Sequence, residues 1–444
     1  MAEKKKTLVT VSQWEVFKNR RRILQNPLPF HKENFEKHGD TFLVNIGMGG
    51  KVVFTRDAET IKYILQQNHK NYYKSSLQTK DLAKYIGHGI LTANGDFWRV
   101  HRRMVQPAFH KKKLEGLLQI MYKGIEGELQ RIEAGRTFDV FPLMGDLAFQ
   151  VVARSLFSAD DIRDRMRRLQ HITGTNQEML IKEMRQPFKK WWFYLSGQVG
   201  RHLGLAKEAR EILNAIIQER VDSGDDKDDL LDMLLKARYE NGGAMSRKQL
   251  IDEVLILFTA GHETTANALS FTLFLLAGHK AVQERLYEEV GKIDFNGDMM
   301  AFLNGLRYTR QCVEEAMRLY PPVYVIDRVA LETDTVAGHG YKKGTVWLMS
   351  IYELHRHKGF WKNPGEFVPE RFDATNKKDC SNYYYPFGAG PRMCVGNNFA
   401  MYEMLMVVAL VVRRYRLATP LENIELNPLI SLKPVQVPIK FEPR

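Results

Sequence analysis

The chain has 444 residues, of which 44% are hydrophobic and 26% charged, and this balance is typical of a globular protein and excludes a disordered one. Lysine and arginine number 65 against 52 aspartates and glutamates, which gives a net charge of +13. Such an excess is found in proteins that bind nucleic acid, anionic lipid or acidic proteins. The basic residues come in short groups, at 4–6, 20–22 and 111–113. Since there is no helix-turn-helix or zinc pattern, we expect no nucleic-acid partner.

The cysteine content points to a reducing compartment. The three cysteines, Cys312, Cys380 and Cys394, are too few and odd in number for a disulfide framework. No apolar leader with a cleavage site follows the first residues. The longest apolar run, residues 404–412, is too short to span a bilayer. We therefore expect a cytoplasmic protein without a membrane anchor.

The first half of the chain begins with short extended segments and becomes helical. The prolines of residues 26–30 predict an extended stretch. Residues 41–46 and 51–55 are rich in β-prone side chains and are joined by a glycine-rich turn at 47–50, which predicts a hairpin. From 57 to 293 proline is sparse and the pattern is mainly helical.

The second half predicts two long helices, a small sheet and a last helix. Ser246 and Gln249 have the spacing of a capping box and begin a helix that runs through Ala277. The remaining expected elements are a helix at 300–320 ended by two prolines, a small sheet at 333–347, irregular coil at 358–393 and a helix at 397–415. The fold class is therefore mainly α with small β pieces, in a single domain over residues 1–444.

The most specific motif is the loop at 387–396, where two glycines and a proline precede Cys394 and an apolar helix follows. Free N–H groups and the helix dipole at such a position favour a thiolate, which can ligate iron. Spacing alone leaves a buried, inert cysteine as the alternative.

This loop resembles the haem-binding loop of the cytochrome P450 family, in which Phe, Gly, Arg, Cys and Gly hold these relative places. The resemblance implies that Cys394 is the axial ligand of the iron of haem b and that Phe387 packs near its sulfur. Arg392 would bind a haem propionate through the fit of guanidinium to carboxylate. The implied fold is a helical prism around a buried haem, with a small β part from about 26–70, 325–350 and 420–444.

The predicted long helix carries a polar interruption at 260–265, where glycine and hydroxyl residues weaken helix propensity. A polar patch on a buried helix would explain any one of these residues. In the P450 family this segment is the oxygen-binding helix. The resemblance implies that Ala260 and Gly261 leave room for dioxygen, and that the acid–alcohol pair Glu263 and Thr264 organises protons for O–O cleavage.

Glu315 and Arg318 are adjacent on one helix face, and such pairs also abound on exposed helices, where they contribute little. The P450 resemblance implies that they form a buried structural network with Arg371. Trp98 and Arg102 also share one helix face, a common pattern. In the family, a Trp and an Arg at this spacing bind haem propionates, and Arg328 aligns with a further propionate-binding arginine.

The implied reaction inserts one oxygen atom of dioxygen into a C–H bond of a small organic substrate, using two electrons from outside. We expect the electrons to come from a separate ferredoxin and its reductase. Arg99, Arg103 and the lysines at 111–113 are candidates for docking that donor, and generic surface charge is the alternative. A haem-binding sensor without turnover would have no need of Glu263 and Thr264.

The expected substrate pocket mixes rings with hydrogen-bonding groups, as a site for a hydroxylated substrate would. The candidate residues are Tyr72, Tyr85, His88, Gln177 and Tyr324, with Asn176 and Gln78 nearby. The chain is also similar to P450s of marine flavobacteria that oxidatively demethylate 6-O-methyl-D-galactose with release of formaldehyde. If the polar groups face solvent instead, a fatty acid or terpenoid is the alternative substrate.

Overall fold

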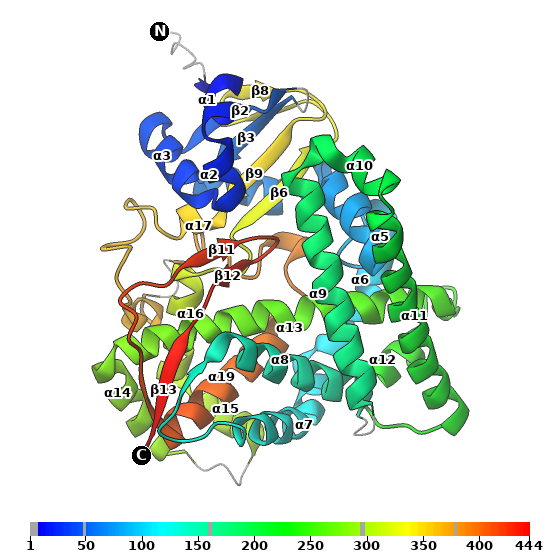
Figure 1. Cartoon of the computed structure of the whole chain (residues 1–444), viewed down its shortest axis with the longest axis vertical. Coiled ribbons are helices and arrows are strands. Elements are labelled where there is room, and N and C mark those ends of the chain that lie inside the picture. Colours follow the sequence, from blue (N-terminus) through cyan, green and yellow to red (C-terminus); the bar gives the residue numbers. More distant parts are fainter. Residues whose placement is uncertain (1–7, 48–49, 159–161, 294–297, 377–379) are drawn as a thin grey trace. The chain divides into compact units, whose positions relative to one another are not determined.

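The structure is a computed structural model of the chain (Figure 1), and it describes residues 8–47, 50–158, 162–293, 298–376 and 380–444. The basic group at 4–6 and residues 48–49 of the expected hairpin turn lie outside this part. The chain divides into two units. Unit 1 comprises Met1–Ser75, Tyr308–Cys394 and Leu421–Gln436, and unit 2 comprises Ser76–Arg307, Val395–Pro420 and Val437–Arg444. The expectation of a single domain stays a prediction.

Unit 1 is built on a six-stranded sheet of order β1-β2-β3-β9-β6-β4. The expected hairpin is confirmed, because β2 and β3 pair antiparallel with Phe42 opposite Phe54. Large apolar side chains on these strands face the core, and Phe42 and Val53 are fully buried. The strands are β1 (Thr10–Val11), β2 (Thr41–Asn45), β3 (Lys51–Thr55), β4 (Tyr72–Tyr73), β6 (Val325–Ala330) and β9 (Val346–Ser350).

The other elements of unit 1 are short helices and two ribbons. The sheet expected at 333–347 is confirmed by the ribbon of β7 (Asp334–Val336) and β8 (His339–Tyr341). The second ribbon joins β11 (Leu426–Pro428) and β12 (Leu432–Pro434). The helices are α1 (Gln13–Lys18), α2 (Arg20–Gln25), α3 (Leu28–His38), α4 (Ala58–Lys62), α17 (Ile351–Leu354) and α16 (Arg307–Leu319). The first residue of α16, Arg307, is assigned to unit 2. Short turns are η2 (Tyr63–Gln67), η3 (His69–Asn71), η7 (Pro369–Phe372) and η8 (Gly390–Arg392).

Two sequence expectations about helices were wrong. Of residues 26–30 only Asn26 is extended (φ −148°, ψ 104°), since α3 begins at Leu28 with Pro27 as its cap. Proline is tolerated there because the first helical turn leaves its N–H groups unpaired in any case. The single helix expected at 300–320 is two helices, because Leu306 has non-helical dihedral angles (φ −75°, ψ 61°) directly after Gly305.

Unit 2 is dominated by helices, with α13 as the longest of those described (Figure 1). The predicted cap is confirmed, as Ser246 Oγ accepts from the Gln249 N–H at 3.2 Å. The helices are α5 (Ala83–Ile86), α6 (Gly95–Val105), α7 (Lys111–Leu129), α8 (Val140–Phe157), α9 (Arg163–Arg185), α10 (Lys190–Leu195), α11 (Gln198–Ser223), α12 (Leu230–Lys236), α13 (Arg247–Gly278), α14 (Lys280–Gly291), α15 (Met299–Gly305) and α19 (Asn397–Arg414). Short turns are η4 (Leu77–Leu82), η5 (Gln106–Phe109) and η6 (Pro187–Lys189). A three-stranded sheet joins β10 (Tyr415–Ala418), β13 (Pro438–Pro443) and β5 (Thr137–Asp139).

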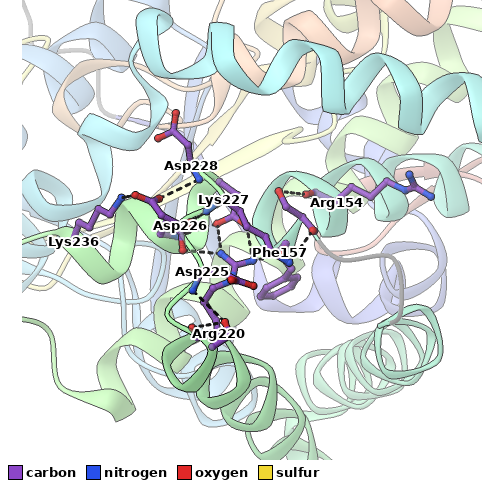
Figure 2. A network of polar contacts seen from close by, with 12 residues as sticks. Arg154, Phe157, Arg220, Asp225, Asp226, Lys227, Asp228 and Lys236 are labelled. Carbon is purple, nitrogen blue, oxygen red and sulfur yellow. Dashed lines mark hydrogen bonds and ion pairs between the residues drawn. The ribbon is translucent and has the colours of Figure 1, made fainter.

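A buried ionic network joins three helices of unit 2 (Figure 2). Arg220, on α11, pairs with Asp229 at 2.8 Å and with Asp232 of α12 at 2.7 Å. It also donates to the carbonyl oxygen of Phe157, the last residue of α8. All three charged side chains are buried, so these pairs fix where α11 and α12 lie against α8.

One helix of the described residues is long and apolar enough to cross a membrane by length and composition alone. It is α8, and 61% of its apolar window is buried inside the structure. It was not predicted from the sequence as a candidate span. A core helix of a folded protein has the same character, and α8 packs against α13 in the core of unit 2.

Candidate functional site

The loop that carries Cys394 has a tightly constrained backbone. Gly388 and Gly390 have φ of +72° and +67°, which favour glycine over other residues. A Cβ on Gly390 would lie 2.0 Å from the carbonyl oxygen of Leu65, so any side chain there would displace the backbone. The Cys394 N–H donates to the Phe387 carbonyl oxygen at 2.9 Å. The loop therefore has one backbone path, which presents Cys394 three residues before α19 begins.

Cys394 differs from the other two cysteines in its surroundings. Cys312 and Cys380 are buried, whereas Cys394 is exposed. A buried, inert cysteine thus describes Cys312 and Cys380 and does not describe Cys394. An accessible thiol just before a helix is a suitable axial ligand for an iron centre.

Three cations of unit 1 approach one another beside this loop. Arg392 ends the turn η8, Arg328 lies on β6, and Lys74 directly follows β4. Burial lowers the pKa of Lys74 well below its usual value, and the charges of Arg328 and Arg392 lower it further, against the opposing effect of Asp327. Two arginines and Lys74, whose uncharged form burial favours, thus lie together with the carboxylate of Asp327. The cluster therefore suits a ligand that carries carboxylates.

Lys74 was missed in the sequence analysis. Its place follows from strand pairing, because β4 and β6 are antiparallel with Tyr72 opposite Ala330 and Tyr73 opposite Val329. One more step of this register brings Lys74 opposite Arg328. An isolated lysine after two tyrosines gives no signal in the sequence, since the pairing joins residues far apart in the chain.

The polar segment of α13 remains helical throughout. Thr264 Oγ1 donates to the carbonyl oxygen of Ala260 at 3.0 Å, and Thr265 Oγ1 donates to that of Gly261 at 3.0 Å. Such side-chain bonds satisfy the hydroxyls within the helix, as they also do at Ser270 and Thr272. A Cβ on Gly261 would lie 3.3 Å from Val152 of α8. Glycine at this position therefore lets α8 and α13 pack closely.

Glu263 is tied to a neighbouring helix. The side-chain amide of Gln177, on α9, donates to its carboxylate. Gln177 was predicted from the sequence to contact the substrate, and in the structure it binds the acid of the acid–alcohol pair. The position of the Glu263 carboxylate thus depends on where α9 lies.

Trp98 and Arg102 lie on one face of α6, both partly buried. Arg102 Nε donates to Gln106 Oε1 at 3.0 Å. His101, between them in sequence, is buried on another face and its Nδ1 lies 3.1 Å from Glu253 Oε1. The roles of Trp98 and Arg102 toward haem propionates stay predictions.

Two carboxylates near the start of α13 hold the segment before α6. The Ile90 N–H donates to Glu253 at 3.0 Å, and the His88 N–H donates to Asp252 at 3.2 Å. A Cβ on Gly87 would lie 2.3 Å from Asp252, and one on Gly89 would lie 2.6 Å from Glu253. Glycine at both positions is therefore required for the backbone to reach these acids. These contacts of Asp252 and Glu253 were not predicted from the sequence.

Glu315, Arg318 and Arg371 form one network in unit 1, as the resemblance implied. Arg318 binds Glu315 through Nε at 2.6 Å and Nη2 at 2.8 Å, and Arg371 Nε lies 3.2 Å from Glu315 Oε1. Arg318 also donates to the carbonyl oxygens of His355, Pro364 and Glu366. Arg318 and Glu315 are fully buried. Their contacts link α16 to the coil before η7, which supports a structural role.

The hydroxyls of the three candidate substrate tyrosines each have an acceptor within the protein. Tyr72 donates to Asp334 at 2.7 Å, Tyr85 to Glu183 at 2.9 Å, and Tyr324 to the carbonyl oxygen of Leu429 at 2.9 Å. All three tyrosines are buried. The side chain of His88 is exposed, and its backbone N–H donates to Asp252 at 3.2 Å.

Comparison with known proteins identifies the family. The family model described as cytochrome P450 matches residues 12–441. The chain belongs to the cytochrome P450 family. It is 30% identical over 436 residues to cyclooctatin synthase of Streptomyces melanosporofaciens, covering 95% of this chain and 92% of that protein. It is 29% identical to cyclooctat-9-en-7-ol 5-monooxygenase of the same organism, over 89% of this chain and 86% of the other.

A mammalian relative and a solved structure agree with this assignment. Cytochrome P450 4A10 of Mus musculus is 32% identical, over 83% of this chain and 76% of that protein. The crystal structure of a cytochrome P450 (CYP102L1) superposes with a TM-score of 0.82 at 23% identity, covering 95% of both chains. The mainly α fold with a small β part is thereby confirmed as the P450 fold.

Members of the family are monooxygenases that bind haem b, and this chain's residues fit that cofactor. The donor set is suitable: an accessible cysteine thiol on a rigid loop, and beside it the cation cluster of Lys74, Arg328 and Arg392 for carboxylate groups. When bound, the haem supplies the oxygen-activating chemistry, and the protein supplies the ligand, proton delivery and substrate orientation.

Proposed function

We propose that this P450 inserts one oxygen atom into a C–H bond of an apolar substrate, with Cys394 as the axial ligand and Glu263 and Thr264 delivering protons. The observation that carries the first role is the accessible thiol on a loop whose path is fixed by Gly390 against Leu65. The haem propionates would be held by Arg392 and Arg328. Trp98 and Arg102, which share one face of α6, would also hold them.

The test is the absorption spectrum of the reduced, carbon monoxide-bound protein beside that of Cys394→Ala. Thiolate ligation gives a Soret band strongly red-shifted from that of a histidine-ligated haem, and the variant should lack it. Cys380→Ala is the matched control and should keep the wild-type band. A red-shifted band that persists in Cys394→Ala would reject the assignment of this ligand.

The proton-delivery role rests on the acid–alcohol pair of α13. The Thr264 hydroxyl already donates to Ala260, so it can accept a further hydrogen bond and pass a proton on. Thr264→Val removes this group at nearly constant volume. We expect turnover of the variant to consume electrons while releasing peroxide in place of hydroxylated product. Thr265→Val is the control, and equal peroxide release from both variants would contradict the role of Thr264.

An apolar substrate is supported by the commitment of the candidate tyrosines to protein acceptors. Tyr72, Tyr85 and Tyr324 each donate their hydroxyl proton internally, and a substrate hydroxyl would have to displace these bonds. The name of one relative gives cyclooctat-9-en-7-ol as its substrate. A fatty acid or terpenoid therefore fits this chain better than a carbohydrate.

Oxidative demethylation of 6-O-methyl-D-galactose is the second candidate, favoured by polar side chains on α9. Asn176 and Gln177 lie there as neighbours, and an amide can keep one protein partner, here His202 or Glu263, while its other atom bonds a sugar hydroxyl. In this reaction dioxygen, two electrons and two protons convert the methyl ether to a hemiacetal and water. The hemiacetal then breaks its C–O bond to give the free sugar and formaldehyde.

A binding titration distinguishes the two substrates. Entry of the true substrate should shift the Soret band of the oxidised protein as it displaces water near the iron. We expect medium-chain fatty acids or terpenoid alcohols to cause this shift and 6-O-methyl-D-galactose to cause none. A shift with the methylated sugar alone, accompanied by formaldehyde release on turnover, would establish the demethylase instead.

We further propose that a cytoplasmic ferredoxin with its reductase supplies the electrons. The candidate docking cations Arg99, Arg103 and the lysines at 111–113 are exposed, and an acidic ferredoxin would be steered to them. Lys111→Glu with Lys112→Glu should slow electron transfer from a ferredoxin at low salt, and the exposed Lys248→Glu should not. Equal rates in all three proteins, or rates that do not fall with salt, would reject this surface.

A further inference from the structure

His355 is a fully buried histidine of unit 1 and directly follows α17 (Figure 1). Its side chain and its main chain bond to different parts of the unit. The Nε2 atom accepts from the Tyr385 N–H at 2.9 Å, and the carbonyl oxygen accepts from Arg318 at 2.8 Å. His355 thus connects the buried network of Glu315 and Arg318 with the segment that leads into the cysteine loop.

The hydrogen bond from Tyr385 fixes the tautomer of the His355 ring. A ring nitrogen that accepts carries no proton, so the proton of the neutral ring is on Nδ1. Burial lowers the pKa of His355 well below its usual value, and the charges of Arg318 and Arg356 lower it further. The carbonyl oxygens of Arg318 and Met317 act in the opposite direction. The ring therefore stays neutral, and Nε2 keeps the lone pair that the Tyr385 N–H needs.

Tyr385 begins the turn that leads into the cysteine loop. The Gly388 N–H donates to the Tyr385 carbonyl oxygen at 3.1 Å, which closes a four-residue turn at 385–388. Within this turn the Phe387 carbonyl oxygen accepts from the Cys394 N–H at 2.9 Å. Three hydrogen bonds thus lead in succession from His355 Nε2 to the backbone of Cys394.

The residue before Tyr385 is held from the same side. The Tyr384 hydroxyl donates to the carbonyl oxygen of Glu314, on α16, at 2.7 Å. The Tyr384 ring lies against the His355 ring, with centroids 5.1 Å apart and planes inclined at 30°. This packing fixes the imidazole but supplies no acceptor for the Tyr385 N–H. Because a buried N–H without an acceptor is unfavourable, loss of Nε2 would drive the turn to rearrange.

We propose that His355 is a positioning residue for the thiolate of Cys394. Its Nε2 fixes the turn at 385–388, and the turn fixes the backbone of Cys394. This role rests on the proposed function of Cys394 as the axial ligand. It also gives the network of Glu315 and Arg318 a consequence at the haem site, because Arg318 holds the main chain of His355. A loop released from His355 would let the sulfur leave the iron more readily.

Two substitutions of His355 separate the acceptor from the ring. Glutamine can place an amide oxygen close to the position of Nε2, whereas phenylalanine fills the space without an acceptor. The haem-loaded full chain is reduced under carbon monoxide, and the half-time for conversion of the red-shifted Soret band to an unshifted band is measured. We expect His355→Phe to shorten this half-time by about fivefold or more, the factor that one such hydrogen bond contributes to an equilibrium. His355→Gln should stay within about twofold of the wild type.

Amide hydrogen exchange reports on the same contact without the iron ligand. The peptide that covers residues 383–388 should exchange faster by about fivefold or more in His355→Phe, because the Tyr385 N–H has lost its acceptor. In His355→Gln this peptide should exchange as in the wild type.

Phe42→Leu is the control for a general loss of stability in unit 1. Phe42 is fully buried on β2, and its ring packs against Phe35 and Phe54. The variant should lower the melting temperature and still keep the half-time within about twofold of the wild type. If His355 acted on stability alone, Phe42→Leu and His355→Phe would shorten the half-time alike.

Failure of this role can be told from failure of the ligand assignment. Wild-type protein without the red-shifted band would reject Cys394 as the axial ligand and with it the role of His355 toward the thiolate. A red-shifted wild-type band together with a normal half-time in His355→Phe would overturn the positioning role alone. Equal effects of the two substitutions, including loss of haem from both, would overturn it as well, because the acceptor would not be what matters. Loss of haem from His355→Phe and not from His355→Gln would support it.

Discussion

Glu315→Gln tests whether the buried network of unit 1 is structural. Glutamine keeps the shape of the side chain but removes its charge and replaces one acceptor oxygen by a donor. Glu315 accepts from Arg318 twice, from Arg371 and from the Val368 N–H at 3.0 Å. At least one of these four donors then faces an NH₂ group, and two guanidinium groups lose their carboxylate.

The expected cost follows from the burial of this group. Removing one member of a buried ion pair costs about 3–5 kcal/mol, because the remaining charge is left uncompensated. The unfolding entropy is about 2.1 cal/mol/K per residue, which for 444 residues gives about 0.9 kcal/mol/K. The melting temperature should therefore fall by about 3–5 °C if the chain unfolds as one, and by more if unit 1 unfolds by itself.

The assay is thermal unfolding of the haem-loaded protein followed by far-ultraviolet circular dichroism. Glu332→Gln is the matched control in the same unit, since Glu332 pairs with Lys343 at 2.9 Å and both side chains are exposed. A surface pair of this kind contributes about 0–1 kcal/mol, so its loss should move the melting temperature by about 1 °C or less. Equal shifts in the two variants would refute the reasoning.

Three further predictions use other parts of the chain. Gly390→Ala should lower the fraction of protein with the red-shifted carbon monoxide band, because its Cβ would lie 2.0 Å from the Leu65 oxygen; a normal spectrum would contradict this. Arg220→Met should lower the free energy of unfolding in urea by about 3–5 kcal/mol, since Asp229 and Asp232 would be left buried without it; a loss under about 1 kcal/mol would contradict it. Burial lowers the pKa of His31 to about 4. Its neutral form is favoured in the folded chain, so the free energy of unfolding falls as the pH falls from 6.5 toward 4, where it is lower by about 3 kcal/mol. His31→Leu should flatten this part of the stability curve, and an unchanged slope would exclude His31 as its source.

Local patterns in the sequence predicted those features that depend on neighbours in the chain. The hairpin of β2 and β3, the cap at Ser246 and the pairing of Glu315 with Arg318 each involve residues within a short stretch. Their geometry follows from the periods of strands and helices. The family resemblance then supplied Arg371, which lies far from Glu315 in sequence.

Features that depend on tertiary pairing could not be read in this way. Lys74 approaches Arg328 only because β4 pairs with β6 in a particular register. The prediction of an extended stretch at the start of α3 was wrong for a different reason. Prolines that favour extended chain are equally suited to a first helical turn. Gln177 was predicted from the sequence to contact the substrate, and its bond to Glu263 was not predicted because Glu263 lies on another helix.

The contacts of Asp252 and Glu253 with residues 87–90 lie on the same side of α13 as Glu263 and Thr264. Glu253 and Thr264 are eleven residues apart, which is close to three turns, so they share a face of α13, as do Asp252 and Glu263. The segment held by Asp252 and Glu253 therefore lies on the side of α13 that carries the acid–alcohol pair, about 16 Å along its axis. Gly87 and Gly89 allow this approach because a Cβ on either would collide with the carboxylates. The glycines thus set how closely this segment approaches the helix face that carries Glu263 and Thr264.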